Sequence, residues 1–158
     1  MAAATLRSQG PAYDLLEQLL AAGIDDPCVI AAMTEVPREP FGEPADRMRA
    51  LAARIEALRL APDDHVLEIG TGSGYTAAVL SRLASHVYSI ERDPQRAAAA
   101  RERLAALGYD GISIRCGEGA SGWLEHAPFD AILVLSGSRE VQPFLLDQLA
   151  TGGRIVVA

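Results

Sequence analysis

A run of alternating glycines between an apolar segment and a helical segment constrains this chain's fold more than any other feature. His65–Ile69 predicts a strand, Gly70–Gly74 (Gly-Thr-Gly-Ser-Gly) a tight turn, and Tyr75–Leu83 a helix. Glycine permits positive φ and lets the backbone approach a ligand that a Cβ would obstruct. Amides at the start of the following helix can donate hydrogen bonds to that ligand. The run therefore predicts a ligand-binding turn at the carboxyl end of a strand.

Strands and helices alternate through the rest of the chain, which predicts a parallel sheet with helices on both faces. Apolar runs that suit strands buried on both sides support this α/β, doubly wound, Rossmann-like fold with strand order 3-2-1-4-5. The remaining strands are expected at His86–Ile90, Ile112–Cys116, Asp130–Leu135 and Arg154–Val157, and the helices at Pro94–Leu107 and Val141–Leu149.

The residues before the first strand predict a helical segment. Helices are expected at Tyr13–Ala22, from Pro27 to just before Val36, and at Ala45–Leu58. Asp26 is a suitable N-cap for the second of these. We expect residues 1–62 to pack on a core formed by residues 63–158, and the 158-residue length fits one domain overall.

The composition argues against several classes of partner. The formal charge is −7, from 14 basic and 21 acidic residues, so no nucleic-acid partner is expected. The arginines within 47–59 and 92–103 are interpreted as solvated helix faces. We expect no secretory signal, no membrane span and no metal. Cys28 and Cys116 are isolated, which indicates reduced core thiols of a cytoplasmic protein.

An acidic residue at the end of the second strand strengthens the ligand prediction. Glu91 lies 21 positions after Gly70, where a carboxylate can accept both ribose hydroxyls of an adenosine. The NAD fingerprint would need glycine at position 75, which is Tyr75 here. Glu68 beside the loop would repel a pyrophosphate but attract the cationic S-adenosylmethionine. The residues thus favour S-adenosylmethionine, the alternative being a structural turn that binds no nucleotide.

A third loop, Gly117–Gly119, follows the third strand and can reach the adenine. Glu118 could accept its exocyclic amine, the alternative being an ordinary turn with a solvated glutamate. The residues predicted to bind the cofactor are Glu68, Gly70, Thr71, Gly72, Ser73, Gly74, Tyr75, Glu91, Arg92, Gly117, Glu118 and Gly119.

These motifs together resemble the protein-L-isoaspartate O-methyltransferase family. The resemblance extends over most of the chain, and the Val-Pro-Arg-Glu, Gly-Tyr and Gly-Trp segments are more specific to the family than the glycine loop. The matching segments are Gly23–Pro27, Met33, Val36–Glu39, Val66–Tyr75, Val87–Glu91, Leu107–Tyr109, Gly117–Gly119, Gly122–Trp123, Pro128–Asp130, Gln148–Leu149 and Gly152–Arg154.

The resemblance implies a class I methyltransferase that transfers a methyl group from S-adenosylmethionine to the side carboxylate of an isoaspartyl residue, which starts protein repair. The acceptor would then be a protein or peptide. Two alternatives stay open. One is a methyltransferase acting on an amine or hydroxyl of a peptide or small molecule, and the other is a cofactor-binding domain without turnover.

Three departures from the family affect the acceptor side. The family has a longer segment before the first strand, with a Gln-Thr-Ile-Ser-Gln-Pro-like run, and gapless alignment back from Leu60 puts Asp46 at the family's serine. Asp46 would repel a carboxylate or accept a proton from another nucleophile, which makes it the candidate catalytic residue. Leu135–Ser138 replaces the family's Thr-Ala-Ala.

The third departure is that the family's final strand pair does not follow the fifth strand, Arg154–Val157. We expect this strand to be an edge with bare apolar side chains, which predicts a homodimer through that edge or poor solubility of the monomer. The alternative is that the N-terminal helices cover it.

Overall fold

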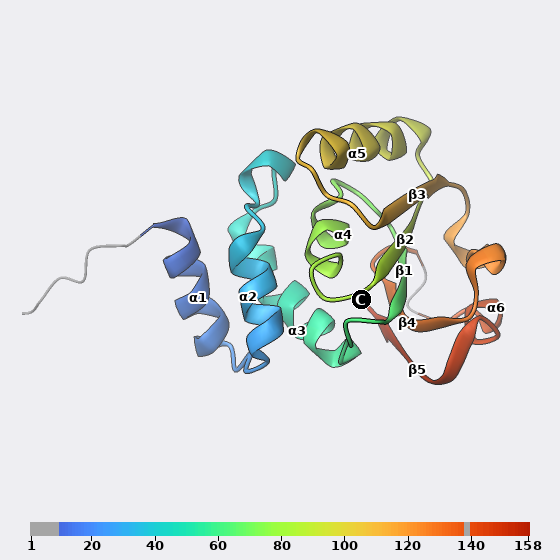
Figure 1. Ribbon diagram of the computed structural model, residues 1–158, viewed down its shortest axis with the longest axis horizontal. Helices are drawn as coiled ribbons and strands as arrows, with labels where there is room; N and C mark the ends of the chain where they lie inside the picture. Colours follow the sequence, from blue (N-terminus) through green and yellow to red (C-terminus); the bar gives the residue numbers. More distant parts are fainter. Residues whose placement is uncertain (1–9, 138–139) are drawn as a thin grey trace, which may run out of the picture.

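The computed structural model describes residues 10–137 and 140–158 and shows a five-stranded parallel sheet with helices on both faces (Figure 1). The strand order is β3-β2-β1-β4-β5, so the predicted fold class and topology are confirmed. The strands are β1 (His65–Ile69), β2 (His86–Glu91), β3 (Ile112–Cys116), β4 (Phe129–Val134) and β5 (Leu149–Val157). The α-helices are α1 (Pro11–Ala21), α2 (Pro27–Glu35), α3 (Met48–Leu58), α4 (Tyr75–Leu80), α5 (Pro94–Ala106) and α6 (Pro143–Leu146). Short 3-10 helices are η1 (Glu39–Phe41), η2 (Ala45–Arg47), η3 (Gly119–Ser121) and η4 (Leu124–His126).

Two hydrophobic clusters lie on the two faces of the sheet. The larger cluster joins α1–α4 and Leu104 of α5 to the alternate residues Val66, Val87 and Leu133 of the strands. The smaller cluster joins the opposite face to α6 and to the segment around η4. The helical segment and the sheet therefore share the larger cluster.

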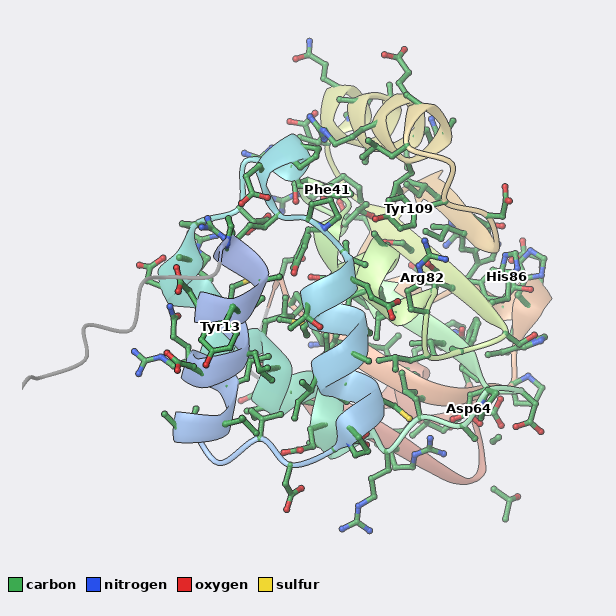
Figure 2. All side chains as sticks on the ribbon, turned by 60° about the vertical axis from the view of Figure 1, so that its left-hand side comes forward. Tyr13, Phe41, Asp64, Arg82, His86 and Tyr109 are labelled. Atoms are coloured by element: carbon green, nitrogen blue, oxygen red, sulfur yellow. The ribbon has the colours of Figure 1, made fainter. Side chains whose placement is uncertain are left out.

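Phe41 fixes the segment before α3 to the core. Its ring centroid lies 5.5 Å from that of Tyr75 and 6.1 Å from that of Tyr109. The guanidinium of Arg82 lies 5.1 Å from the Tyr109 ring centroid, and Figure 2 shows these side chains between the helical segment and α5. Phe41 is almost fully buried, so this aromatic group holds the short connection between α2 and α3 against the start of α4.

The helix boundaries follow local capping where proline and aspartate coincide. Asp26 caps α2 by accepting from the Cys28 and Val29 amides, as predicted, and Asp93 caps α5 in the same way. The predicted helix Val141–Leu149 is wrong at both ends. Gln142 is extended because it precedes Pro143, and proline then begins a four-residue helix. Leu149 already belongs to β5, whose pairing with β4 shifts register near Gly152.

β5 is an edge strand, and its side chains are partly covered on both faces. Val156 packs against the larger cluster, and Ile155 and Val157 pack against the smaller one. The prediction of bare apolar faces is therefore wrong, because α3 lies against β5. Arg154 strengthens this contact by donating to the Leu58 carbonyl at 2.6 Å, which satisfies an acceptor at the end of α3.

The two cysteines lie on the surface, so the prediction of core thiols is wrong. Cys28 lies on the outer side of the first turn of α2, and Cys116 is the last residue of β3. Both thiols are free. Within residues 10–137 and 140–158, no helix is long and apolar enough to cross a membrane.

Candidate cofactor and acceptor site

A cavity of about 800 Å³ runs along the carboxyl ends of the central strands. This is the edge at which ligands bind in open parallel sheets. Its walls come from the start of α3, the turn after β1, the ends of β2 and β4, and the segments that follow β3 and β4. They include Glu43, Asp46, Arg47, Leu51, Arg54, Ile69, Gly70–Ser73, Ile90–Arg92, Arg96, Glu118–Ala120, Val134–Gly137, Gln142 and Leu145.

The glycine turn depends on its glycines at two points. Gly70 has φ +99°, and a Cβ there would lie 2.5 Å from Oγ of Ser136 in the segment after β4. Gly74 has φ +91°, and a Cβ there would lie 3.2 Å from Leu104 of α5. A side chain at Gly70 would therefore push apart the walls contributed by β1 and β4, and one at Gly74 would displace α5.

Glu91 links the end of β2 to the glycine turn. Its carboxylate accepts from the Gly72 amide at 2.9 Å and from the Asp93 amide at 3.0 Å, and it faces the cavity. An ionised carboxylate offers about four acceptor positions, so two remain for a ligand. The arrangement fits a ribose diol.

The segment after β3 forms the far end of the cavity. Glu118 is exposed and lines this end, where its carboxylate can meet the amine edge of a planar ring. Gly119 is in such close contact with Ile69 that a Cβ would overlap that side chain. Ile90 and Leu145 provide apolar surface beside it. This end therefore fits an adenine ring between apolar side chains and a carboxylate.

Glu68 lies behind the turn. It is fully buried and accepts a hydrogen bond from Ser89 at 2.5 Å, while the hydroxyls of Ser89 and Thr71 lie 2.6 Å apart. Burial raises the pKa of the Glu68 carboxyl to about 8; the Ser89 hydrogen bond opposes the shift and the charge of Glu91 adds to it. Glu68 therefore supports the turn as a largely neutral acid through Ser89 and Thr71.

The structure brings nine of the thirteen predicted site residues to the cavity wall. These are Asp46, Gly70, Thr71, Gly72, Ser73, Glu91, Arg92, Glu118 and Gly119. Glu68, Gly74, Tyr75 and Gly117 are absent from the wall but contact the residues that form it. The Tyr75 amide donates to Ser73 Oγ at 3.3 Å, and the Gly117 amide donates to the Glu91 carbonyl at 3.0 Å.

Sequence reasoning missed the residues that the segment before β1 brings to the cavity. Glu43 accepts a hydrogen bond from Ser73 Oγ at 2.5 Å and so ties the connection after Phe41 to the glycine turn. Arg47, Arg54 and Arg96 also line the cavity, so the interpretation of these arginines as solvated faces is incomplete. The i, i+7 spacing of Arg47 and Arg54, which places them on one side of a helix, was the available signal.

The sheet order, the glycine turn and the acidic residue at the end of β2 define an S-adenosylmethionine-dependent methyltransferase with the class I fold. The chain's relatives identify which kind. The family model for protein-L-isoaspartate(D-aspartate) O-methyltransferase matches residues 11–158, and the chain belongs to that family.

Two curated relatives illustrate the relationship. The protein-L-isoaspartate O-methyltransferase 2 of Pelobacter propionicus is 44% identical over 174 aligned positions, covering 97% of this chain and 77% of the relative. The protein-L-isoaspartate O-methyltransferase of Protochlamydia amoebophila is 42% identical, and the alignment covers 89% of this chain and 76% of that relative. The first alignment is longer than the 158-residue chain, so that relative carries internal residues that this chain lacks.

Solved structures agree. A protein-L-isoaspartate O-methyltransferase superposes with a TM-score of 0.83 at 29% identity, covering 93% of this chain and 55% of that one. A putative protein-L-isoaspartate O-methyltransferase from Plasmodium falciparum, in complex with S-adenosyl-L-homocysteine, has the same fold, with a TM-score of 0.74 at 22% identity. The superposition covers 94% of this chain and 84% of the Plasmodium falciparum chain.

The burial of Glu68 predicts a pH-dependent stability. The unfolded carboxyl ionises above its ordinary pKa of 4.5, whereas the folded one stays protonated up to about 8. Unfolding therefore releases a proton in this range, and the free energy of unfolding falls as pH rises, by up to about 1.4 kcal/mol per pH unit. Urea unfolding from pH 5 to 8 should show this slope in the wild type and a flatter one in Glu68→Gln. Glu102→Gln, on the exposed side of α5, is the control, and a Glu68→Gln curve parallel to the wild type contradicts the assignment.

Proposed function

We propose that S-adenosylmethionine binds along this cavity with its adenosine over the ends of β2 and β3. Glu91 accepts the ribose hydroxyls, Glu118 accepts the adenine amine, and Gly70–Ser73 hold the methionine part. Arg92 lies beside Glu91 on the same wall. The observation that carries the proposal is the Glu91 carboxylate, which holds the Gly72 amide and keeps free acceptor positions toward the cavity.

The surrounding residues act by positioning and by charge. When bound, S-adenosylmethionine supplies an electrophilic methyl group on a cationic sulfur, and a carboxylate that accepts it becomes a neutral methyl ester and releases no proton. A carboxylate acceptor therefore needs no general base, so orientation and exclusion of water provide most of the help. The supporting residues Glu68, Gly74, Tyr75 and Gly117 keep the turn and the Glu91 carbonyl in place from behind.

We propose that the acceptor is the side carboxylate of an isoaspartyl residue in a protein or peptide, and that the reaction serves protein repair in the cytoplasm. Membership of the family and the names of the curated relatives support this acceptor. Asp46, which lines the cavity at the start of α3, supports the alternative of an amine or hydroxyl acceptor, because a carboxylate can take a proton from either.

Calorimetric titration with S-adenosylmethionine tests the cofactor assignment. Glu91→Ala removes a bidentate charged acceptor and should weaken binding by about 1.5–3 kcal/mol, or roughly 10- to 100-fold. Glu91→Gln keeps an acceptor oxygen and the side-chain volume, so its affinity for S-adenosylmethionine should lie between those of the wild type and Glu91→Ala. This variant separates the loss of the ligand contact from a disturbance of the glycine turn. Glu102→Ala should match the wild type. Equal affinity in Glu91→Ala would exclude the ribose contact.

Methyl release measured with an isoaspartyl peptide, beside small amine and hydroxyl acceptors, tests the acceptor. For a carboxylate acceptor, Asp46→Asn should keep or increase the rate because a repelling charge is removed. For an amine or hydroxyl acceptor that uses Asp46 as a base, the same change should lower the rate about 100- to 10,000-fold. Cofactor binding without methylation of any acceptor would instead indicate a binding domain without turnover.

We also propose that two copies pair through the outer edge of β5, whose backbone has a strand neighbour on one side only in the described sheet. Sedimentation velocity over a range of concentrations should show a dimer. Thr151→Lys, at an exposed position of β5, should shift the protein toward the monomer because a lysine at the edge disfavours pairing. Ser81→Lys, at a partly exposed position after α4, is the control. A wild-type monomer at all concentrations would rule out this interface.

A further inference from the structure

Helix α3 and the 3-10 turn η2 before it form one wall of the cavity and present cationic side chains to it. Arg47, Leu51 and Arg54 lie on this wall and are spaced so that they share one side of the helix. The helix packs against β4 and β5, and the segment after β4 (135–137) lines the cavity beside it. The wall is therefore at the β4 end of the cavity.

The two ends of the cavity differ in position and in lining. Glu91 and Glu118 lie at the ends of β2 and β3, on the opposite side of β1 from β4. Adenosine held by these two carboxylates, as proposed above, occupies that side. The β4 end, with α3, then remains for the methyl acceptor.

Arg54 is half-buried at this end of the cavity. It makes no ion pair and no hydrogen bond within residues 10–137 and 140–158. Arg103 and Arg154, by contrast, each donate to backbone carbonyls. A partly desolvated guanidinium without an acceptor is unfavourable, and an anionic ligand would satisfy it.

Three acidic residues, Glu43, Asp46 and Glu140, line the cavity on the same side as Arg54, and none of them forms an ion pair with it in the described part of the chain. Glu43 is engaged by Ser73 at the glycine turn, and Asp46 is exposed. Arg47, also exposed on the wall, adds a second positive charge beside Asp46.

We propose that Arg54, assisted by Arg47, forms a carboxylate subsite that binds the methyl acceptor and selects anionic over neutral acceptors. The inference rests on the proposed function. A guanidinium holds a carboxylate but not its neutral methyl ester, so the subsite favours substrate entry and product release. Because the acceptor's charge is already decreasing in the transition state, Arg54 contributes to binding and not to the chemical step. It is a specificity-determining residue.

Steady-state methylation of an isoaspartyl peptide separates these two effects. Arg54→Gln should raise KM for the peptide about 10- to 100-fold, the loss expected for a charge-assisted contact, while kcat stays within about twofold. Arg54→Lys should recover part of the loss. Arg49→Gln, on the exposed side of the same helix and off the cavity wall, is the matched control and should match the wild type. A fall in kcat with unchanged KM, or wild-type kinetics in Arg54→Gln, overturns the subsite.

A binding measurement without turnover gives an independent result. The isoaspartyl peptide and its carboxamide analogue are titrated into the protein saturated with S-adenosyl-L-homocysteine. The wild type should prefer the carboxylate, and Arg54→Gln should lose that preference while its affinity for S-adenosyl-L-homocysteine is unchanged. Equal preference in both proteins overturns the subsite but leaves the proposed function intact. If the wild type neither binds nor methylates the isoaspartyl peptide, the proposed acceptor is wrong and the subsite fails with it.

Discussion

The site depends on the hydrogen bonds that the Glu91 carboxylate accepts from the Gly72 and Asp93 amides. These bonds hold together the two connections that leave neighbouring strands at the same edge of the sheet. The glycine turn leaves β1 and the cap of α5 leaves β2, so one side chain fixes the relative position of both. The two amides have their hydrogen-bond acceptor in Glu91, and the side of the carboxylate that faces the cavity can still accept hydrogen bonds from a ligand.

Two buried glutamates near the turn have different hydrogen-bond surroundings. Glu91 accepts from two backbone amides and faces the cavity, whereas Glu68 receives one hydroxyl hydrogen bond in a fully buried position. Burial, with a smaller contribution from the neighbouring Glu91, raises the pKa of the Glu68 carboxyl. The layer behind the turn therefore carries an acid that favours its neutral form.

Most of the sheet could be predicted from the sequence, because alternating apolar runs, prolines and glycines determine where parallel strands begin and end. The grouping of the residues predicted to bind the cofactor was also predictable, since most of them sit at strand ends that the topology brings to one cavity. The α6–β5 boundary was not, because Pro143 shortens the helix and the Gly152 register shift lengthens the strand. Glu43 and Arg54 were missed because their roles depend on how the segment before β1 packs against the sheet, and charge spacing alone does not show this.

The hydrogen bond between Glu43 and Ser73 holds the chain between Phe41 and α3 against the glycine turn, and α3 supplies part of the cavity wall where we propose that the acceptor binds. Side chains on a helix project from fixed positions, and one can be exchanged without refolding its neighbours. Positions 47, 50 and 54 line the cavity. With the acceptor bound as proposed, its choice becomes open to redesign by point substitutions at these positions, as a library of three sites, with the cofactor half left as it is.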